Sequence, residues 1–392
     1  MVTRTFFNTG QALFSMETYG DLENPQCVVV YDCGGKNAEE AQKAIKRAVK
    51  HDNRNNKKID ALFISHYDGG HINGIKDLLN TYDVEHLFLP CKENAVELIL
   101  SVMYQQKKID DSVLKFYESP KEFLQTLNKS KVRITYINPP QEGNNTETRQ
   151  DINLSDCNNS IQSGTSIKIP PYNDSCWRLI PFNRYVMTDN EWDNFVHQLN
   201  INGNSVADVL RSWKNGRIRL TSRTSKTTLS AERKQSIKDT FLTTLRNKRS
   251  FDINEFSMVL YSGPARECGP ECEDSHCCHS CHLCHHICYL KPDNEIKYGC
   301  LYTGDYNANR NVNELIQNYR QVWNNIGIVQ IPHHGSSNNF SDKLVFPNFY
   351  HVIPYGDQGR APKVKKVDEI TLRIAKSGGF VIMSGRKKCF QL

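Results

Sequence analysis

Three short segments of the sequence carry side chains that bind divalent metal ions, and each segment directly follows an apolar run. These side chains are His66, Asp68 and His71 in the first segment, Asp305 in the second, and His333 and His334 in the third. Zinc takes imidazole nitrogen and carboxylate oxygen, and catalytic zinc sites keep one position open for water. The three segments therefore predict one metal centre, in which His333 or His334 completes the ligand set. Taken singly, each segment would also suit a surface loop with an incidental histidine.

The apolar runs that precede these segments are expected to be buried strands. Residues 27–31, 61–65 and 86–90 are short and rich in β-branched or aromatic side chains, as strands are. Residues 38–50 place alanine, isoleucine and valine at helical spacing. The second half is expected to hold strands at 256–262, 301–303, 328–331, 351–354 and 380–383, and helices at 312–319 and 367–375. The pattern predicts an α/β protein whose metal ligands meet at one edge of a sheet.

The middle of the chain separates these two halves. Residues 139–171 are rich in Asn, Ser, Thr, Gly and Gln, which predicts a long loop or insertion. Residues 177–187 are expected to hold one or two strands, and residues 189–249 several pieces of helix. We therefore expect residues 1–140 to form the N-terminal half, 141–250 a polar and basic insertion, and 251–392 the C-terminal half.

Positive charge is concentrated in one part of this insertion. Residues 211–249 contain twelve Lys or Arg and two acidic residues, whereas the net charge of the whole chain is only +6. Lys and Arg neutralise phosphates, and an aromatic ring among them can stack on a base. Arg217 and Arg219, close to Trp213, would therefore suit a nucleic-acid backbone. A solvated helical face or a protein-docking surface is the alternative.

Cysteine and histidine are concentrated between residues 264 and 300, inside the C-terminal half. The cysteines of this stretch are Cys268, Cys272, Cys277, Cys278, Cys281, Cys284, Cys288 and Cys300. Two pairs have the two-residue gap that lets both thiolates bind one zinc ion. In a cytosolic chain such a cluster indicates a metal site rather than disulfides. We therefore expect a structural zinc-binding insertion, with a reduced loop or an iron–sulfur cluster as the alternatives.

Four motifs in this order resemble those of the metallo-β-lactamase superfamily. They are VYDCG at 30–34, ISHYDGGHING at 64–74, LYTGD at 301–305 and IPHHGS at 331–336. Within the superfamily, the likeness to the ComEC/Rec2-type branch rests on Asp68, which stands where other branches have a second histidine. It also rests on NEFS at 254–257, before the Gly-Asp motif. The resemblance covers residues 5–90 and 250–385.

The resemblance implies an αββα sandwich with a metal site at one sheet edge. It implies a hydrolase that attacks a phosphodiester, often in nucleic acid, with a metal-bound hydroxide. Zn²⁺ is the expected ion, one or two per site, with Mn²⁺ as the alternative. Asp305, His334 and Asp68 would be the catalytic residues, and Asp305 would orient the attacking water. Ser336 and the basic insertion would face the substrate.

One position departs from the family pattern. The family loop carries Asp immediately before its last histidine, and this chain has Gly70 there. Glycine has no ligand atom, so the expected outcomes are a single-metal site, a weak second site or a site that no longer catalyses. An inactive chain would act as a binding component of a multi-protein complex, for example in prokaryotic defence. Hydrolysis of an ester, amide or thioester is a further alternative, because the metal chemistry is shared.

The rest of the sequence indicates where the protein is expected to be located and what it is expected to bind. No apolar run approaches the length of a transmembrane helix, and the first residues lack the apolar stretch of a signal peptide. We therefore expect a cytoplasmic protein that does not enter a membrane. Its expected partners are a nucleic acid or nucleotide and, in the alternative, the proteins of a complex.

Overall fold

The computed structural model describes the two halves of the chain and parts of the middle. The described residues are 2–52, 54, 56–91, 111–140, 151–169, 177–184, 189–201, 231–244, 257–265, 297–355, 361–384 and 390–391.

The first of two mixed sheets is built mainly from the N-terminal half and has the strand order β16-β1-β2-β3-β4-β5-β6-β8. Its strands are β1 Val2–Phe6, β2 Phe14–Gly20, β3 Pro25–Cys33, β4 Lys58–Phe63, β5 Asp83–Pro90, β6 Arg133–Asn138, β8 Ser160–Gln162 and β16 Phe390–Gln391. Strands β3 to β6 pair in parallel. Parallel pairing brings the ends of β3 and β4 to the same edge, where the residues that follow them meet.

The second sheet has the order β15-β14-β13-β12-β11-β10-β9-β7. Its strands are β7 Asp151–Asn153, β9 Ser166–Lys168, β10 Trp177–Phe182, β11 Val259–Pro264, β12 Gly299–Tyr302, β13 Ile326–Gln330, β14 Tyr350–Ile353 and β15 Phe380–Met383. Strands β12 to β15 pair in parallel. The residues after β12 and β13 are therefore neighbours as well.

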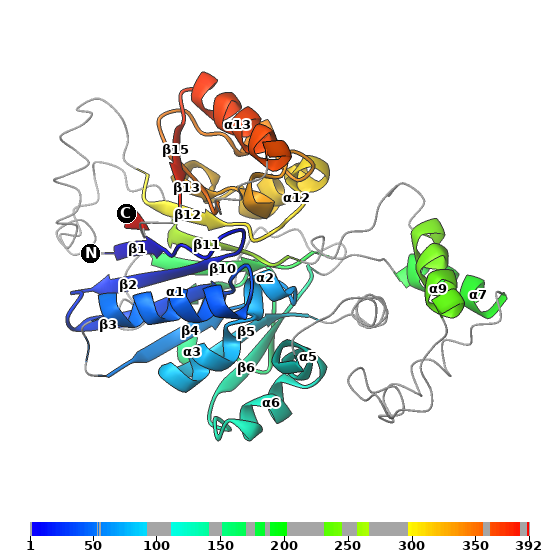
Figure 1. Cartoon of the computed structure of the whole chain (residues 1–392), viewed down its shortest axis with the longest axis horizontal. Helices are drawn as coiled ribbons and strands as arrows, with labels where there is room; N and C mark the ends of the chain where they lie inside the picture. The colour runs from blue at the N-terminus through cyan, green and yellow to red at the C-terminus, as the bar shows by residue number, and fades with distance from the viewer. Residues whose placement is uncertain are drawn as a thin grey trace.

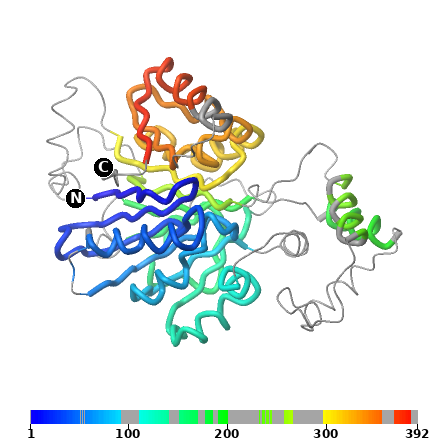
Figure 2. Tube along the Cα trace, in the orientation of Figure 1, coloured from blue at the N-terminus to red at the C-terminus, as the bar shows by residue number. Residues whose placement is uncertain are grey.

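Helices cover the outer face of each sheet (Figure 1). The helices on the first sheet are α1 Ala38–His51, α2 Gly69–Ile72, α3 Ile75–Thr81, α5 Asp111–Glu118 and α6 Pro120–Thr126, and those on the second are α12 Ala308–Tyr319 and α13 Ala361–Lys376. The tube in Figure 2 shows the blue N-terminal layers and the orange C-terminal layers stacked on each other. The architecture is the αββα sandwich that the sequence predicted.

Alternation of side chains along the strands explains these layers. In β3, Val28 and Val30 pack under the helices of the first sheet, whereas Val29 and Tyr31 face the second sheet. The inner layer continues on the opposite sheet with apolar side chains such as Leu260. A third buried cluster joins the outer face of the second sheet to α12 and α13. Strands buried on both faces read as continuous apolar runs, which is why the sequence revealed them.

One buried charged network ties the two sheets together. Arg4 Nε donates to Glu17 Oε1 over 2.5 Å, and both side chains are at most 6% exposed. The Glu17 carboxylate also accepts hydrogen bonds from Tyr19, from Ser262 at 2.5 Å and from Tyr302 at 2.8 Å. A buried carboxylate is tolerated only when its oxygens are satisfied in this way.

The middle of the chain differs from the sequence expectation in one respect. Residues 139–171 were expected to form a long loop or insertion, but they contribute β7, β8 and β9 to the two sheets, whereas β10 lies where strand was expected. Strands β7, β8 and β9 are only three residues long and partly exposed, so they lack the apolar run that marks a buried strand. The boundary expected at residue 141 therefore does not coincide with the end of the sandwich.

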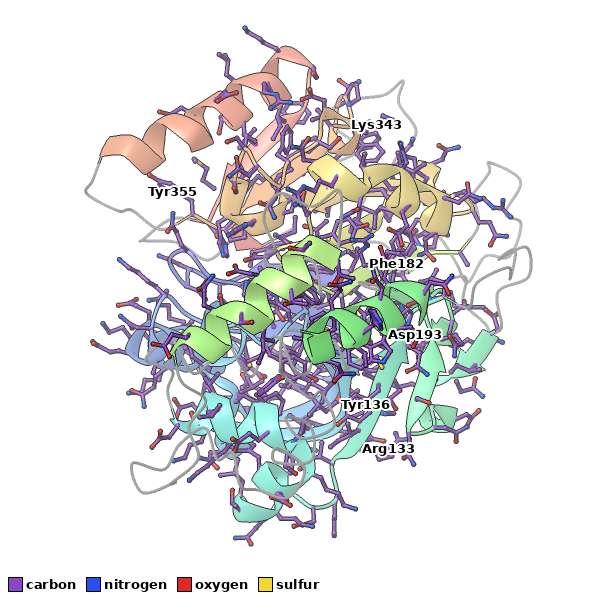
Figure 3. The ribbon with its side chains drawn as sticks, turned by 90° about the vertical axis from the view of Figure 1, so that its right-hand side faces the viewer. Arg133, Tyr136, Phe182, Asp193, Lys343 and Tyr355 are labelled. Carbon is purple, nitrogen blue, oxygen red and sulfur yellow. The ribbon has the colours of Figure 1, made fainter. Side chains whose placement is uncertain are left out.

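Two helices of the middle region are described, α7 Asp189–Ile201 and α9 Ala231–Thr244. They lie side by side in Figure 3, where Asp193 marks α7. Phe195 and Phe241 pack edge to face, with ring centroids 5.5 Å apart, and belong to the same buried cluster as the outer face of the first sheet. None of the described helices combines the length and apolar character needed to cross a bilayer.

Candidate metal centre

The loop after β4 and the short helix α2 position the first two histidines. His66 lies three residues beyond the end of β4, and His71 lies on α2; both are 1% exposed. Gly34 allows α2 to lie directly against the end of β3, because a Cβ at Gly34 would come within 1.8 Å of the Gly70 carbonyl oxygen. The close approach of these two backbones fixes His71 over the sheet edge.

The turns after β12 and β13 bring in the other ligands. Asp305 follows Gly304, whose φ of 53° lies in the left-handed region. His333 and His334 have φ values of 49° and 53°, a backbone conformation that is strained for side chains of this size. The Gln330 side chain holds the two turns together: its Oε1 accepts from Thr303 N at 2.9 Å and Gly304 N at 2.8 Å. Such strain persists where the surrounding bonds impose it.

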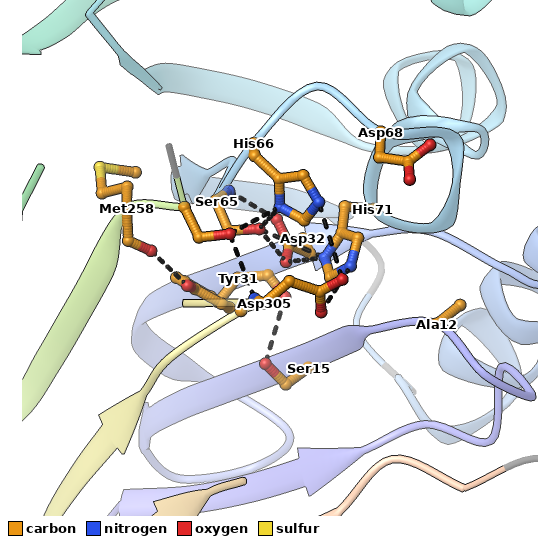
Figure 4. A network of polar contacts seen from close by, with 12 residues as sticks. Ala12, Ser15, Tyr31, Asp32, Ser65, His66, Asp68, His71, Met258 and Asp305 are labelled. Atoms are coloured by element: carbon orange, nitrogen blue, oxygen red, sulfur yellow. Dashed lines mark hydrogen bonds and ion pairs between the residues drawn. The ribbon is translucent and has the colours of Figure 1, made fainter. Parts of the chain in front are cut away.

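The loop after β4, helix α2 and the turns after β12 and β13 converge on the Asp305 carboxylate, and Figure 4 shows His66 and His71 beside it. His71 Nε2 lies 3.2 Å from Asp305 Oδ1, and His66 Nε2 lies 3.9 Å from Oδ2. His334 Nε2 is 3.6 Å from Oδ1 and His333 Nε2 is 3.7 Å from Oδ2. The structure thus brings together five of the six metal-binding residues that the sequence predicted.

The donor atoms of this group fit a metal ion. One atom each of His66, His71 and Asp305 lies within 4.8 Å of the others, which makes them a group able to hold an ion. His66 Nε2, His71 Nε2 and Asp305 Oδ1 are buried and make no hydrogen bond. Buried polar atoms are almost always hydrogen-bonded, so three such atoms facing one point indicate a ligand. Two imidazoles and a carboxylate form a donor set of the kind that zinc takes.

The charges of the group are strongly coupled. Burial opposes the charged form of Asp305, but His71 and His334 outweigh it and hold the pKa of Asp305 well below its ordinary value. Burial lowers the pKa of His71, yet Asp305 and Asp32 raise it to about 10. Burial, reinforced by His71, keeps the pKa of His66 well below 6.5. Burial lowers the pKa of His334 to about 4. His66 and His334 are therefore neutral near pH 7, whereas His71 keeps its second proton and has to release it to bind an ion.

Hydrogen bonds on the far side of the rings orient the histidines. Asp32, with a φ of 58°, lies 2.7 Å from His71 Nδ1 through its Oδ2. Ser65 Oγ lies 3.0 Å from His66 Nδ1, and Ser257 Oγ lies 3.1 Å from the same atom. The sequence placed Asp32 and Ser257 in motifs but gave them no role. The only earlier signal was that Asp32 also ends an apolar run.

Asp68 is the predicted ligand that lies outside the group. Its carboxylate accepts a hydrogen bond from Gly69 N at 2.7 Å and caps the N-terminus of α2. Figure 4 shows it apart from the two histidines and Asp305. Gly70, the position without a ligand atom, has space beside it: a Cβ there would meet only the carbonyl oxygen of Gln11, at 3.9 Å. Neither local crowding nor a left-handed backbone therefore requires glycine at this position.

The remaining predicted residues are placed less completely. Ser336 ends the turn that carries His333 and His334 and is half-buried. Cys300 lies in β12 within the core between the sheets, where burial raises the pKa of its thiol to about 12. In the described part of the chain, no other cysteine or histidine forms a ligand group with Cys300. The other predicted residues lie outside the described residues: Arg217, Arg219, Cys268, Cys272, Cys277, Cys278, Cys281, Cys284 and Cys288.

The fold and this centre define a class: an αββα sandwich with a histidine and carboxylate metal site at the edge where parallel strands end. Residues 22–87 match the family model of the metallo-beta-lactamase superfamily. That segment contains Asp32, His66 and His71. A search of curated proteins found no match. The superfamily match and the ligand group together indicate a metal-dependent hydrolase.

Proposed function

We propose that this protein is a metal-dependent phosphodiesterase that acts on nucleic acid or a nucleotide, and that it works in the cytoplasm. The observation that carries the proposal is the buried group of His66, His71 and Asp305, whose donor atoms make no hydrogen bond and face one point. The preference for a phosphodiester rests on the basic stretch at residues 211–249, which would neutralise a phosphate backbone.

The side chains at the site have separate tasks in this proposal. His66, His71 and Asp305 would hold Zn²⁺ or Mn²⁺, and His334 lies close enough to Asp305 to complete the set. A bound divalent ion supplies a lowered pKa for water and stabilises charge that develops on a phosphoryl oxygen. Asp305 is a carboxylate at neutral pH and would orient the attacking water by accepting its hydrogen bond. His333, which is 31% exposed, and Ser336 would face the substrate.

The test compares the wild-type protein with His66→Ala. Metal content is measured by mass spectrometry, and hydrolysis is measured on an activated phosphodiester, on single-stranded DNA and on RNA. We expect His66→Ala to lose both the ion and the activity. His197→Ala is the matched control, because His197 is an exposed histidine on α7. Absence of bound metal from the wild type, or full activity of His66→Ala, would refute the proposal.

A second candidate function is favoured by Gly70 and by the capping role of Asp68. Asp305 supplies one carboxylate to the group. The first loop adds no second carboxylate, because position 70 is glycine and Asp68 caps α2. In this alternative the site holds an ion weakly or without turnover, and the chain is a binding component of a multi-protein complex. Metal binding without hydrolysis of any tested phosphodiester, ester, amide or thioester would favour it over an enzyme.

A further inference from the structure

His71 has the Asp32 carboxylate beside its Nδ1, whereas His66 has two hydroxyls there, and the His66 ring has to present one particular nitrogen. Its Nε2 faces the centre, so that nitrogen must carry a lone pair to bind an ion. The proton of the neutral ring must then sit on Nδ1. Two hydroxyl groups lie within hydrogen-bond distance of Nδ1: Ser65 Oγ at 3.0 Å and Ser257 Oγ at 3.1 Å. A hydroxyl can donate or accept, so these contacts alone do not set the tautomer.

The proton of Ser65 decides between the two tautomers. Ser65 Oγ donates to Asp32 Oδ2 over 2.7 Å, and the same carboxylate accepts from Ser65 N over 2.7 Å. Asp32 Oδ1 accepts from the Ser65 amide and Asp32 Oδ2 also faces His71 Nδ1, so donors surround this carboxylate and the hydroxyl proton of Ser65 is directed to it. Ser65 Oγ is left as an acceptor toward His66. A hydrogen bond between them then requires the proton on His66 Nδ1.

Ser257 is compatible with the same arrangement. Its Oγ accepts a hydrogen bond from the backbone N of Asp305 at 3.2 Å. With His66 Nδ1 protonated, Ser257 Oγ accepts from His66 Nδ1 and from Asp305 N. With Nδ1 unprotonated, Ser257 could donate to it, but Ser65 Oγ would then face a lone pair at 3.0 Å. The short bonds of Ser65 to Asp32 disfavour that state.

We propose that Ser65 is a positioning residue. Its hydroxyl donates to Asp32 and therefore accepts from His66, which fixes the proton of His66 on Nδ1. One buried carboxylate thereby orients the two imidazoles of the first segment: His71 through its direct hydrogen bond and His66 through the Ser65 hydroxyl. The inference rests on the metal site of the proposed function. It concerns the metal-free protein, however, and can be tested even if no hydrolysis is found.

The test uses Ser65→Ala, with Ser15→Ala as the matched control. Ser15 is a serine of the neighbouring strand β2, 1% exposed, and its Oγ donates to the Tyr31 carbonyl at 3.2 Å. Both variants lose one buried hydroxyl, but only Ser65→Ala loses one of the two hydroxyls that face His66 Nδ1. Nitrogen NMR of metal-free protein labelled on histidine reports the His66 tautomer. Competition with a chromophoric chelator reports zinc affinity.

We expect the Nδ1-protonated tautomer at His66 in the wild type and in Ser15→Ala. In Ser65→Ala we expect a mixture of tautomers and a zinc affinity roughly 10- to 100-fold weaker, as for other groups that orient metal ligands. An Nε2-protonated His66 in the wild type would overturn the proposal without any variant. Equal losses of zinc affinity in Ser65→Ala and Ser15→Ala would overturn it as well. A wild type that binds no zinc but has the expected tautomer would refute the proposed function. It would not contradict the proposal that Ser65 fixes the proton of His66.

Discussion

Asp32 Oδ2 lies 2.7 Å from His71 Nδ1, on the side of the ring opposite the metal-binding nitrogen. The pairing of β3 with β4 creates this contact, because Tyr31 lies beside Phe63 in the parallel register and the residues that follow both strands become neighbours. The bond fixes the His71 ring and leaves Nε2 directed at Asp305. A carboxylate in this place strengthens an imidazole ligand.

Replacing Asp32 by asparagine should therefore weaken metal binding. An amide has no charge to support the imidazole, and we expect the zinc affinity of Asp32→Asn to fall roughly 10- to 100-fold. Titration against a chromophoric chelator measures it. Asp60→Asn is the control, because Asp60 accepts from Val28 N at 2.8 Å on the same sheet but does not belong to the metal-binding group. Equal affinities in Asp32→Asn and the wild type would contradict the assignment.

A carboxylate at position 70 should add a second metal ion. The space beside Gly70 accepts a side chain, and an aspartate there would stand next to His71. We expect Gly70→Asp to raise the metal content from one ion to two per chain, as counted by native mass spectrometry. Gly69→Asp adds the same charge one residue away, where a Cβ meets nothing within 4 Å, and should bind no additional ion. An unchanged count in Gly70→Asp would show that the missing ligand does not limit the site.

The buried Glu17 should matter far more to stability than an exposed acid that also forms an ion pair. Glu17→Ala leaves the Arg4 guanidinium buried without its partner, which we expect to reduce the free energy of unfolding by about 3–5 kcal/mol. Glu39→Ala removes an exposed pair with Lys43, at 2.7 Å, and should change stability little. Urea denaturation of both variants measures the difference. Similar midpoints would show that the network between the sheets contributes little.

Acid should destabilise the fold through His351. Burial lowers the pKa of this histidine to about 4, so the folded state keeps it neutral. Its contribution to stability is present above the unfolded pKa of about 6.5 and is lost as the pH falls toward the folded value. The loss is no more than about 3 kcal/mol for such a shift. Chemical denaturation between pH 7 and pH 4 should therefore show a shallower decline for His351→Gln than for the wild type. Identical declines would exclude this histidine as a cause.

The sequence predicted the fold and most residues of the candidate metal centre for a physical reason. Strands such as β4 and β13 are buried on both faces, so they appear as apolar runs, and His66 and His333 follow them within a few residues. The orienting residues could not be assigned in this way. Ser257 meets His66 across 191 residues of chain, and only the packing of the two sheets brings them together. Asp68 was assigned from its residue type and its place in the motif, but its carboxylate caps the N-terminus of α2 instead.

The long connections between the ligands have a consequence for how this chain tolerates change. The free energy needed to close a loop grows only with the logarithm of its length, so that doubling a connection costs about 0.6 kcal/mol. The connection between β11 and β12, residues 265–298, can therefore lengthen or shorten while the two strands keep their pairing. A connection of different composition could replace the cysteine-rich stretch with little penalty in loop entropy. Changes in this connection could thus alter which molecules contact the protein without changing the metal centre.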